Sequence, residues 1–302
     1  MHFYSLQSSL FPIALLIALV GFVEPVAAQS SLWVEDENPF SNLAVFAGLE
    51  GSKQPQDFGV NAHFGGRTAI SLGMPLWQEW GLGLQVGTSL NATANAVQVV
   101  ERTEGTSGRT QNFTTVGLFQ RFESGLVWGV GYDFLYQDYY DKFSLGQWRG
   151  KLGYFLNENN EIGVQTAIRD RGDSGTFTNI PVHLQPISQG SVYFKHTFST
   201  QATLGCWAGV AGSHGEANYA LGDLPRTDNV FAYGCDVYIP LNNYFALTGE
   251  ANFLTPADTG TVDAFLGLEL RPFGGAMLAR RNRYAPVLST ANNTTMSVDL
   301  QR

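Results

Sequence analysis

The sequence predicts an all-β fold: a single closed antiparallel transmembrane β-barrel of about 12 strands, joined as an up-and-down meander. Three observations predict it. Beyond Asn42, apolar residues recur with a period of two rather than 3.6. The connections between these segments alternate between short and long. The face opposite the apolar one carries Gly, Ser, Thr, Gln and few charges, which suits a lipid-facing outside and a wet inside.

Composition excludes several classes of protein. Charged residues make up 14% of the 302-residue chain and aromatic residues 13%, whereas soluble proteins carry about 25% charged residues. An ordinary soluble enzyme is therefore disfavoured, and so is a disordered chain, because there is ample apolar surface to bury. The net charge of −9 argues against a nucleic-acid partner, since phosphates must be neutralised by cations.

Four regions follow from the chain order. Residues 1–28 are typical of a cleaved secretory signal peptide, because the apolar run Leu10–Val23 precedes small residues that end at Ala28. An N-terminal anchor is the alternative, although the run is short for a span. Residues 29–41 are expected to form a solvated periplasmic lead-in, 42–273 the barrel, and 274–302 a polar, disordered tail.

Twelve segments carry the two-residue alternation, and most are near the ~9–11 residues that a tilted strand needs to cross a bilayer. In order, they are 42–50, 58–73, 82–99, 113–121, 126–137, 146–156, 162–170, 187–198, 202–212, 229–239, 244–254 and 262–273. Tight turns follow the fourth, sixth, eighth and tenth segments. The long connections 100–112, 171–186 and 213–228 lie at the opposite end. This separation by length is typical of outer-membrane barrels.

On these features, residues 42–273 resemble bacterial outer-membrane β-barrel proteins of the porin-like kind. That resemblance implies an outer-membrane location, contact with lipid, and no enzymatic activity. The stretch 38–61, which begins Asn-Pro-Phe-Ser-Asn-Leu, is also similar to an uncharacterised secreted family of planctomycete bacteria, which implies no particular activity.

The candidate site is the set of charged residues that alternation turns inward. Basic residues dominate the sixth to eighth segments and acidic residues the tenth to twelfth. Two opposed charged walls would orient polar solutes in a pore. The alternative is that the charges pair with one another across a filled interior. The predicted lining residues are Arg67, Arg121, Asp133, Arg149, Lys151, Arg169, Lys195, Asp236, Glu250, Asp263 and Glu269.

The two cysteines, Cys206 and Cys235, fall on the outward phase of consecutive strands. Their numbers have the same sum as the strand ends 212 and 229, so the register predicts that they lie opposite each other on the lipid face. A disulfide and two separate thiols packed by lipid both remain open.

We expect passive passage of small polar solutes, with no cofactor and no metal. A closed structural or interaction barrel that displays its loops is the alternative. A barrel hydrolase with a rim site is the third reading, built on His183 with Asp170 and Asp173, or on His214 with Asp223 and Asp228.

Overall fold

The computed structural model describes residues 32–34, 38–58, 61–96, 108–212, 217–218, 222–223, 229–255 and 261–301. The predicted signal peptide lies outside these residues. No helix within the described ranges is both long and apolar enough to span a membrane.

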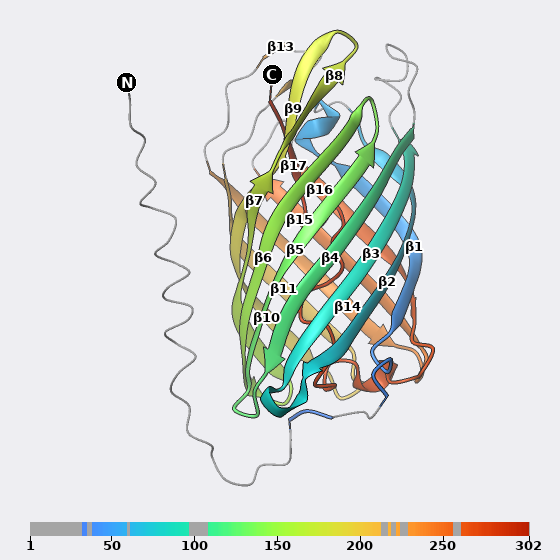
Figure 1. Cartoon of the computed structure of the whole chain (residues 1–302), viewed down its shortest axis with the longest axis vertical. Helices are drawn as coiled ribbons and strands as arrows, with labels where there is room; N and C mark the ends of the chain where they lie inside the picture. Colours follow the sequence, from blue (N-terminus) through green and yellow to red (C-terminus); the bar gives the residue numbers. More distant parts are fainter. Residues whose placement is uncertain are drawn as a thin grey trace.

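Twelve antiparallel strands close into one barrel, which confirms the predicted fold class (Figure 1). Neighbours along the chain are neighbours in the barrel, and β1 pairs with β16 to close it. The barrel strands are β1 (Ala44–Lys53), β2 (His63–Trp77), β3 (Leu82–Asn95), β4 (Gly108–Arg121), β5 (Leu126–Asp138), β6 (Lys142–Asn157), β7 (Asn160–Arg171), β10 (Gln189–Thr197), β11 (Thr203–Ala211), β14 (Val230–Pro240), β15 (Phe245–Thr255) and β16 (Thr261–Leu270).

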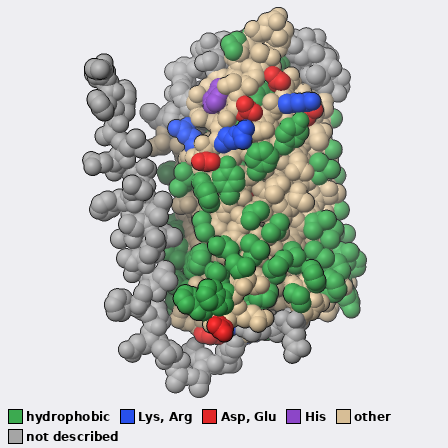
Figure 2. Space-filling model, viewed as in Figure 1, with side chains coloured by type: hydrophobic (Ala, Val, Ile, Leu, Met, Phe, Trp, Pro, Cys, Tyr) green, Lys and Arg blue, Asp and Glu red, His purple; other side chains and the backbone are tan. Residues whose placement is uncertain are grey.

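Alternation along each strand separates an apolar outer face from an inner face. Leu266 is 53% exposed and Val164 42%, whereas the inward-facing Asp133 is fully buried. Figure 2 shows apolar side chains over most of the visible barrel wall, with charged side chains gathered nearer the ends. Because these apolar side chains have no protein to cover them, the outer wall has the character of a lipid-facing surface.

We call the end of the barrel that holds the tight connections, such as 122–125 and 241–244, the turn end. The opposite end, which holds the connection 172–188 between β7 and β10, is the loop end. At the turn end, Trp77 and Trp80 are exposed and their rings stack at 5.0 Å across the 3₁₀ turn η3 (Gln78–Trp80). At the loop end, the connection predicted at 171–186 contains a hairpin of β8 (Asp173–Phe177) and β9 (Ile180–Pro186). Two short strands, β12 (Ala217–Asn218) and β13 (Gly222–Asp223), pair with each other in another predicted long loop.

The C-terminal region is not the disordered periplasmic tail that the sequence predicts. After the 3₁₀ turn η4 (Ala276–Leu278) at the turn end, residues 284–297 pass through the barrel interior, and most are buried. Val298–Gln301 then forms β17, which pairs with β9 at the loop end (Figure 1). We call residues 284–297 the lumen segment. Its polar composition is typical of a solvated tail, but polar side chains inside the barrel form hydrogen bonds with it in place of water.

Apolar clusters pack around both ends of the lumen segment. At the loop end, Met296 joins Phe113, Leu135 and the hairpin in one buried cluster. At the turn end, Tyr284 and Val287 pack with a second cluster. This second cluster also holds Trp33, which corrects the prediction that 29–41 is a solvated lead-in: Trp33 is 4% exposed, and its indole N–H donates to the carbonyl of Phe122 at 2.9 Å.

A third cluster closes the opposite side of the loop end. Ala211, Val230, Ala232 and Leu254 face inward there and pack with Ile187. The inner face is therefore polar in its middle and carries apolar clusters near both ends.

Candidate functional site

The lumen segment lies against a wall of inward-facing glycines on β2, β3 and β5. A Cβ at Gly73 would overlap the carbonyl of Tyr284, and one at Gly87 would overlap the Thr290 hydroxyl. A Cβ at Gly129 would lie 3.0 Å from the Val287 side chain. Since any larger residue would occupy this space, the glycines form the groove that admits the segment.

Side chains of the barrel wall form hydrogen bonds with the backbone N–H and C=O groups of the lumen segment. Gln85 binds both backbone groups of Leu288. Arg149 donates to the Ser289 carbonyl at 2.6 Å, and the Thr115 hydroxyl accepts from the Ala291 N–H at 2.9 Å. Buried backbone groups need such partners, and here the strands supply them through side chains.

Polar side chains of the segment also reach the wall on both sides. Asn293 and Gln111 exchange amide hydrogen bonds at 2.8 and 3.0 Å, and Asn293 also donates to the buried Glu50. On the far side, the Thr294 hydroxyl donates to Glu250 at 2.7 Å. The segment is thus bonded across the width of the lumen.

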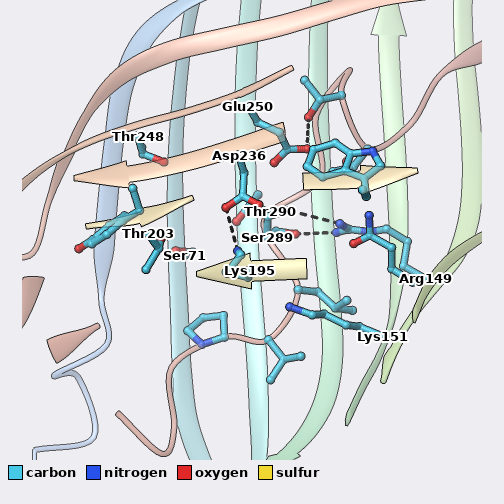
Figure 3. A pocket seen from close by; sticks show the side chains of 18 of the residues that line it. Ser71, Arg149, Lys151, Lys195, Thr203, Asp236, Thr248, Glu250, Ser289 and Thr290 are labelled. Carbon is cyan, nitrogen blue, oxygen red and sulfur yellow. Dashed lines mark hydrogen bonds and ion pairs between the residues drawn. The ribbon is translucent and has the colours of Figure 1, made fainter. Parts of the chain in front are cut away.

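A cavity of about 380 Å³ remains beside the lumen segment, lined by that segment and by residues of β1, β2, β4–β7, β10, β11 and β14–β16 (Figure 3). It lies on the turn side of the apolar cluster that contains Ile187. Eight of the eleven predicted lining residues reach it: Arg67, Arg121, Arg149, Lys151, Lys195, Asp236, Glu250 and Glu269.

Three predicted lining residues do not line this cavity. Asp133 and Asp263 are fully buried beyond it, where Asp133 binds Arg149, and Asp263 accepts from Gln54 at 2.9 Å. Arg169 has the inward phase but lies exposed at the loop end, in a second hollow with Gln185 and Asp299.

The two unpaired charged walls expected from the sequence are not found, because the charges pair. Lys195 Nζ lies 2.8 Å from Asp236, and Lys151 Nζ lies 3.3 Å from Glu161. Glu269 pairs with Arg271 at 2.9 Å. The transverse field that two walls would create is therefore largely cancelled within the described residues.

Several inward charges were not among the predicted lining residues. Glu50 and Glu161 follow the inward phase of β1 and β7, but Glu50 is the last residue of the predicted segment 42–50 and Glu161 lies just before the predicted segment 162–170. Asp57 lies in the 3₁₀ turn η2 (Pro55–Asp57), which folds into the loop end of the barrel. There its carboxylate pairs with the buried Arg109 at 3.2 Å and lies 3.3 Å from His63.

Part of the side-chain arrangement that a rim hydrolase needs is present, because a serine lies beside His183. The Ser174 hydroxyl and His183 Nδ1 are 2.9 Å apart across the β8–β9 hairpin, where Ser174 is exposed and His183 is half-buried. The neighbouring Asp173 instead accepts from the backbone N–H groups of Ser144 and Ser174, and no acidic side chain of the described residues pairs with His183. His214 and Asp228, and the side chain of Asp223, lie outside the described residues.

The predicted register of the cysteines is confirmed. Cys206 on β11 and Cys235 on β14 are direct cross-strand partners on the outer face, and both are unbonded thiols in this structure. Whether they oxidise stays a prediction.

These features define a class: a closed antiparallel β-barrel whose interior is occupied by its own C-terminal segment. The chain belongs to the family of unknown function DUF6666, whose model matches residues 42–298. The matched region extends past the last barrel strand through the lumen segment, so barrel and segment belong to one family unit. No curated protein matches the chain.

Solved structures with a similar arrangement are outer-membrane proteins. The outer membrane phospholipase A of Escherichia coli is 11% identical, with a TM-score of 0.40 over 75% of this chain and 95% of that one. The translocator domain of the autotransporter NalP from Neisseria meningitidis is 10% identical, with a TM-score of 0.45 over 76% and 89%. The KdgM porin is 9% identical, with a TM-score of 0.40 over 75% and 98%. At these values the likeness carries nothing about activity.

Proposed function

We propose that the chain is an outer-membrane β-barrel that its own lumen segment keeps closed, and that it serves as a structural or interaction barrel that displays its loop end. The observation that carries the proposal is the passage of residues 284–297 through the lumen, bonded to strands on both sides.

The membrane location rests on the outer wall. Exposed apolar side chains occur on every barrel strand, while the backbone groups of the closed sheet are paired with neighbouring strands. Closure of this kind suits lipid, which cannot satisfy a free strand edge. The exposed indoles of Trp77 and Trp80 at the turn end suit a membrane interface.

At the loop end, β8, β9 and β17 form a separate three-stranded sheet in which β9 is central. In outer-membrane barrels the longer loops face the exterior. On that orientation, the exposed residues of the β8–β9 hairpin, such as Ser174, Thr176 and Pro181, are presented outside the cell, where a partner could reach them.

Passive passage of small polar solutes, the function expected from the sequence, is the second candidate. The observation that favours it is the charged cavity of about 380 Å³ beside the lumen segment. Passage along it requires the apolar cluster at the loop end, which includes Val230 and Leu254, to part.

Single-channel conductance in a planar lipid bilayer tests the two candidates. The exported chain should give no conductance steps, whereas a variant that ends at Arg283 should give them, because the lumen segment is gone. A variant that lacks only residues 298–302 is the control and should stay closed. Steps from the unaltered chain equal to those of the Arg283 variant would overturn the closed-barrel proposal in favour of a porin.

A further inference from the structure

The turn-side part of the cavity gathers four basic side chains around one carboxylate. Glu161 binds Lys151 at 3.3 Å and Arg280 at 3.1 Å. Lys195 stands directly opposite Glu161 in the β7–β10 register, and Arg121 interacts electrostatically with the same carboxylate. Within the described ranges, Lys195 is the one of these four bases that pairs with a second acid, Asp236.

Arg121 is the least compensated of the four. It is 7% exposed, and its Nη2 donates to the backbone carbonyl of Ala285 at 3.1 Å. Its Nε has no hydrogen-bond partner in the described part of the chain. A guanidinium buried in this way retains strong donor capacity toward an anion.

Further donors without partners line the same cavity. Among the residues that the structure describes, nothing pairs with Arg280 Nε, Arg67 Nη1 or the amide nitrogen of Asn252. Arg67 is 5% exposed and Asn252 is 1% exposed, so neither side chain is free to reach bulk water. Unsatisfied buried donors are costly, so an acceptor that they reach by a small shift of these side chains would be favourable.

The lining of the cavity as a whole is also positively charged. Seven basic and four acidic residues line the cavity. Two further acids behind the lining, Asp133 and Glu50, pair with Arg149 and Arg67, which leaves an excess of one positive charge. The excess is unexpected in a chain with a net charge of −9, because basic residues are the minority overall. The cavity is also within the range of about 300–1,000 Å³ that is typical of small-molecule sites.

We propose that this cavity binds a small anionic solute, and that Arg121, Lys151 and Arg280 hold its phosphate or carboxylate group. The site depends on the folded barrel but not on whether the barrel conducts. Glu161 tunes the site by neutralising part of its charge.

Isothermal titration calorimetry on the folded full chain tests the proposal. Inorganic phosphate and succinate are the two anionic probes, and glucose is the neutral one. Saturable binding is expected for at least one anion and not for glucose, and the anion that binds more tightly identifies the group recognised. Arg121→Gln should weaken that binding about tenfold or more, because one charge-assisted hydrogen bond is lost.

Two further variants separate a binding role from a folding defect. Glu161→Gln should tighten anion binding, an effect that a misfolded site could not produce. Arg169→Gln removes the same charge from the exposed loop end, outside the cavity, and should leave binding unchanged. Absence of saturable binding to either anion overturns the proposal. So does anion binding that is unaffected by both Arg121→Gln and Glu161→Gln.

Discussion

The side-chain amide of Gln85 on β3 pairs with the backbone of Leu288 in the lumen segment as a neighbouring strand would. Its Nε2 donates to the Leu288 carbonyl at 3.0 Å, and its Oε1 accepts from the Leu288 N–H at 3.1 Å. The same oxygen accepts from the Val287 N–H at 3.0 Å. One inward glutamine thus satisfies three backbone groups that would otherwise be buried without partners.

Replacing Gln85 should therefore weaken the hold on the lumen segment. In Gln85→Leu the three backbone groups lose their partner, at a cost of about 1–3 kcal/mol for a buried unsatisfied group. Urea unfolding from lipid vesicles should show a lower free energy of unfolding. Gln120→Leu, which changes an amide on the outer face near Trp80, is the matched control and should cost less. Equal losses in the two variants would contradict the role assigned to Gln85.

The glycine groove predicts a sharp contrast between two positions on β2. In Gly73→Val the new side chain would meet the backbone of Tyr284 and the ring of Pro286, neither of which can rotate away. We expect this overpacking to cost about 1–3 kcal/mol and to displace the segment. Hydrogen–deuterium exchange of peptides from 284–297 should become faster.

Gly66→Val is the control on the same strand, because a Cβ there meets no atom within 4 Å. It should leave exchange in 284–297 as it is in the unaltered chain. Unchanged exchange in Gly73→Val would show that the groove does not position the segment.

The barrel could be predicted from the sequence because each strand carries its own signal. Leu126, Trp128 and Val130 alternate with small residues over a length that matches a membrane-crossing strand, and such local patterns need no knowledge of the rest of the chain. The register of Cys206 and Cys235 followed from strand ends alone.

The filled interior could not be predicted in the same way. Residues 289–295, Ser-Thr-Ala-Asn-Asn-Thr-Thr, show no apolar periodicity, so they look like a solvated tail. The partners of the lumen segment, such as Gln85 for Leu288 and Gln111 for Asn293, are about 180–200 residues away in the chain. The available signal was the inward glycine wall, which leaves one side of a wide barrel too empty to be filled by its own side chains.

The two cysteines should form a disulfide on mild oxidation. Phe198 N–H donates to the Ala202 carbonyl at 2.8 Å. Hydrogen-bonded pairs alternate with non-hydrogen-bonded pairs along an antiparallel ladder, so the backbone of Cys206 forms its hydrogen bonds with β10. By the same alternation, the hydrogen bond from Leu241 N–H to the Phe245 carbonyl at 2.8 Å implies that the backbone of Cys235 forms its hydrogen bonds with β15. The cysteine pair is therefore a non-hydrogen-bonded one, the kind in which side chains lie closest.

Free thiols counted in the denatured chain should fall from two to zero after oxidation with diamide, with the protein still monomeric. The Cys235→Ala variant should retain one thiol. Two thiols that persist in the oxidised protein, or a covalent dimer, would contradict the geometry.

The β8–β9 hairpin should loosen at low pH. Backbone N–H groups of Thr176 and Lys142 donate to Asp141, each at 2.8 Å, and lower the pKa of that carboxyl below its ordinary 3.8. A lowered folded-state pKa contributes stability above the ordinary pKa, and that stability is lost as pH falls through the folded value. The Thr176 amide, with its exchange corrected for intrinsic pH dependence, should therefore be fully protected above about pH 4 and should lose protection as the pH falls below that value.

The Asp141→Asn variant should show no such pH dependence, because an amide does not titrate in this range. If protection at Thr176 varied with pH equally in both proteins, Asp141 would not be the group responsible.

A cross-link between the wall and the lumen segment tests most directly whether the C-terminal segment occupies the barrel. A Cβ at Gly129 would lie 3.2 Å from that of Val287, close to the separation of about 3.5–4.5 Å in a disulfide. With Cys206 and Cys235 replaced by alanine, the Gly129→Cys/Val287→Cys variant should form an intramolecular disulfide in the membrane-inserted protein. If the two thiols instead stayed reduced under oxidant and reacted fully with a water-soluble maleimide, the segment would lie outside the lumen and the closed-barrel account would be wrong.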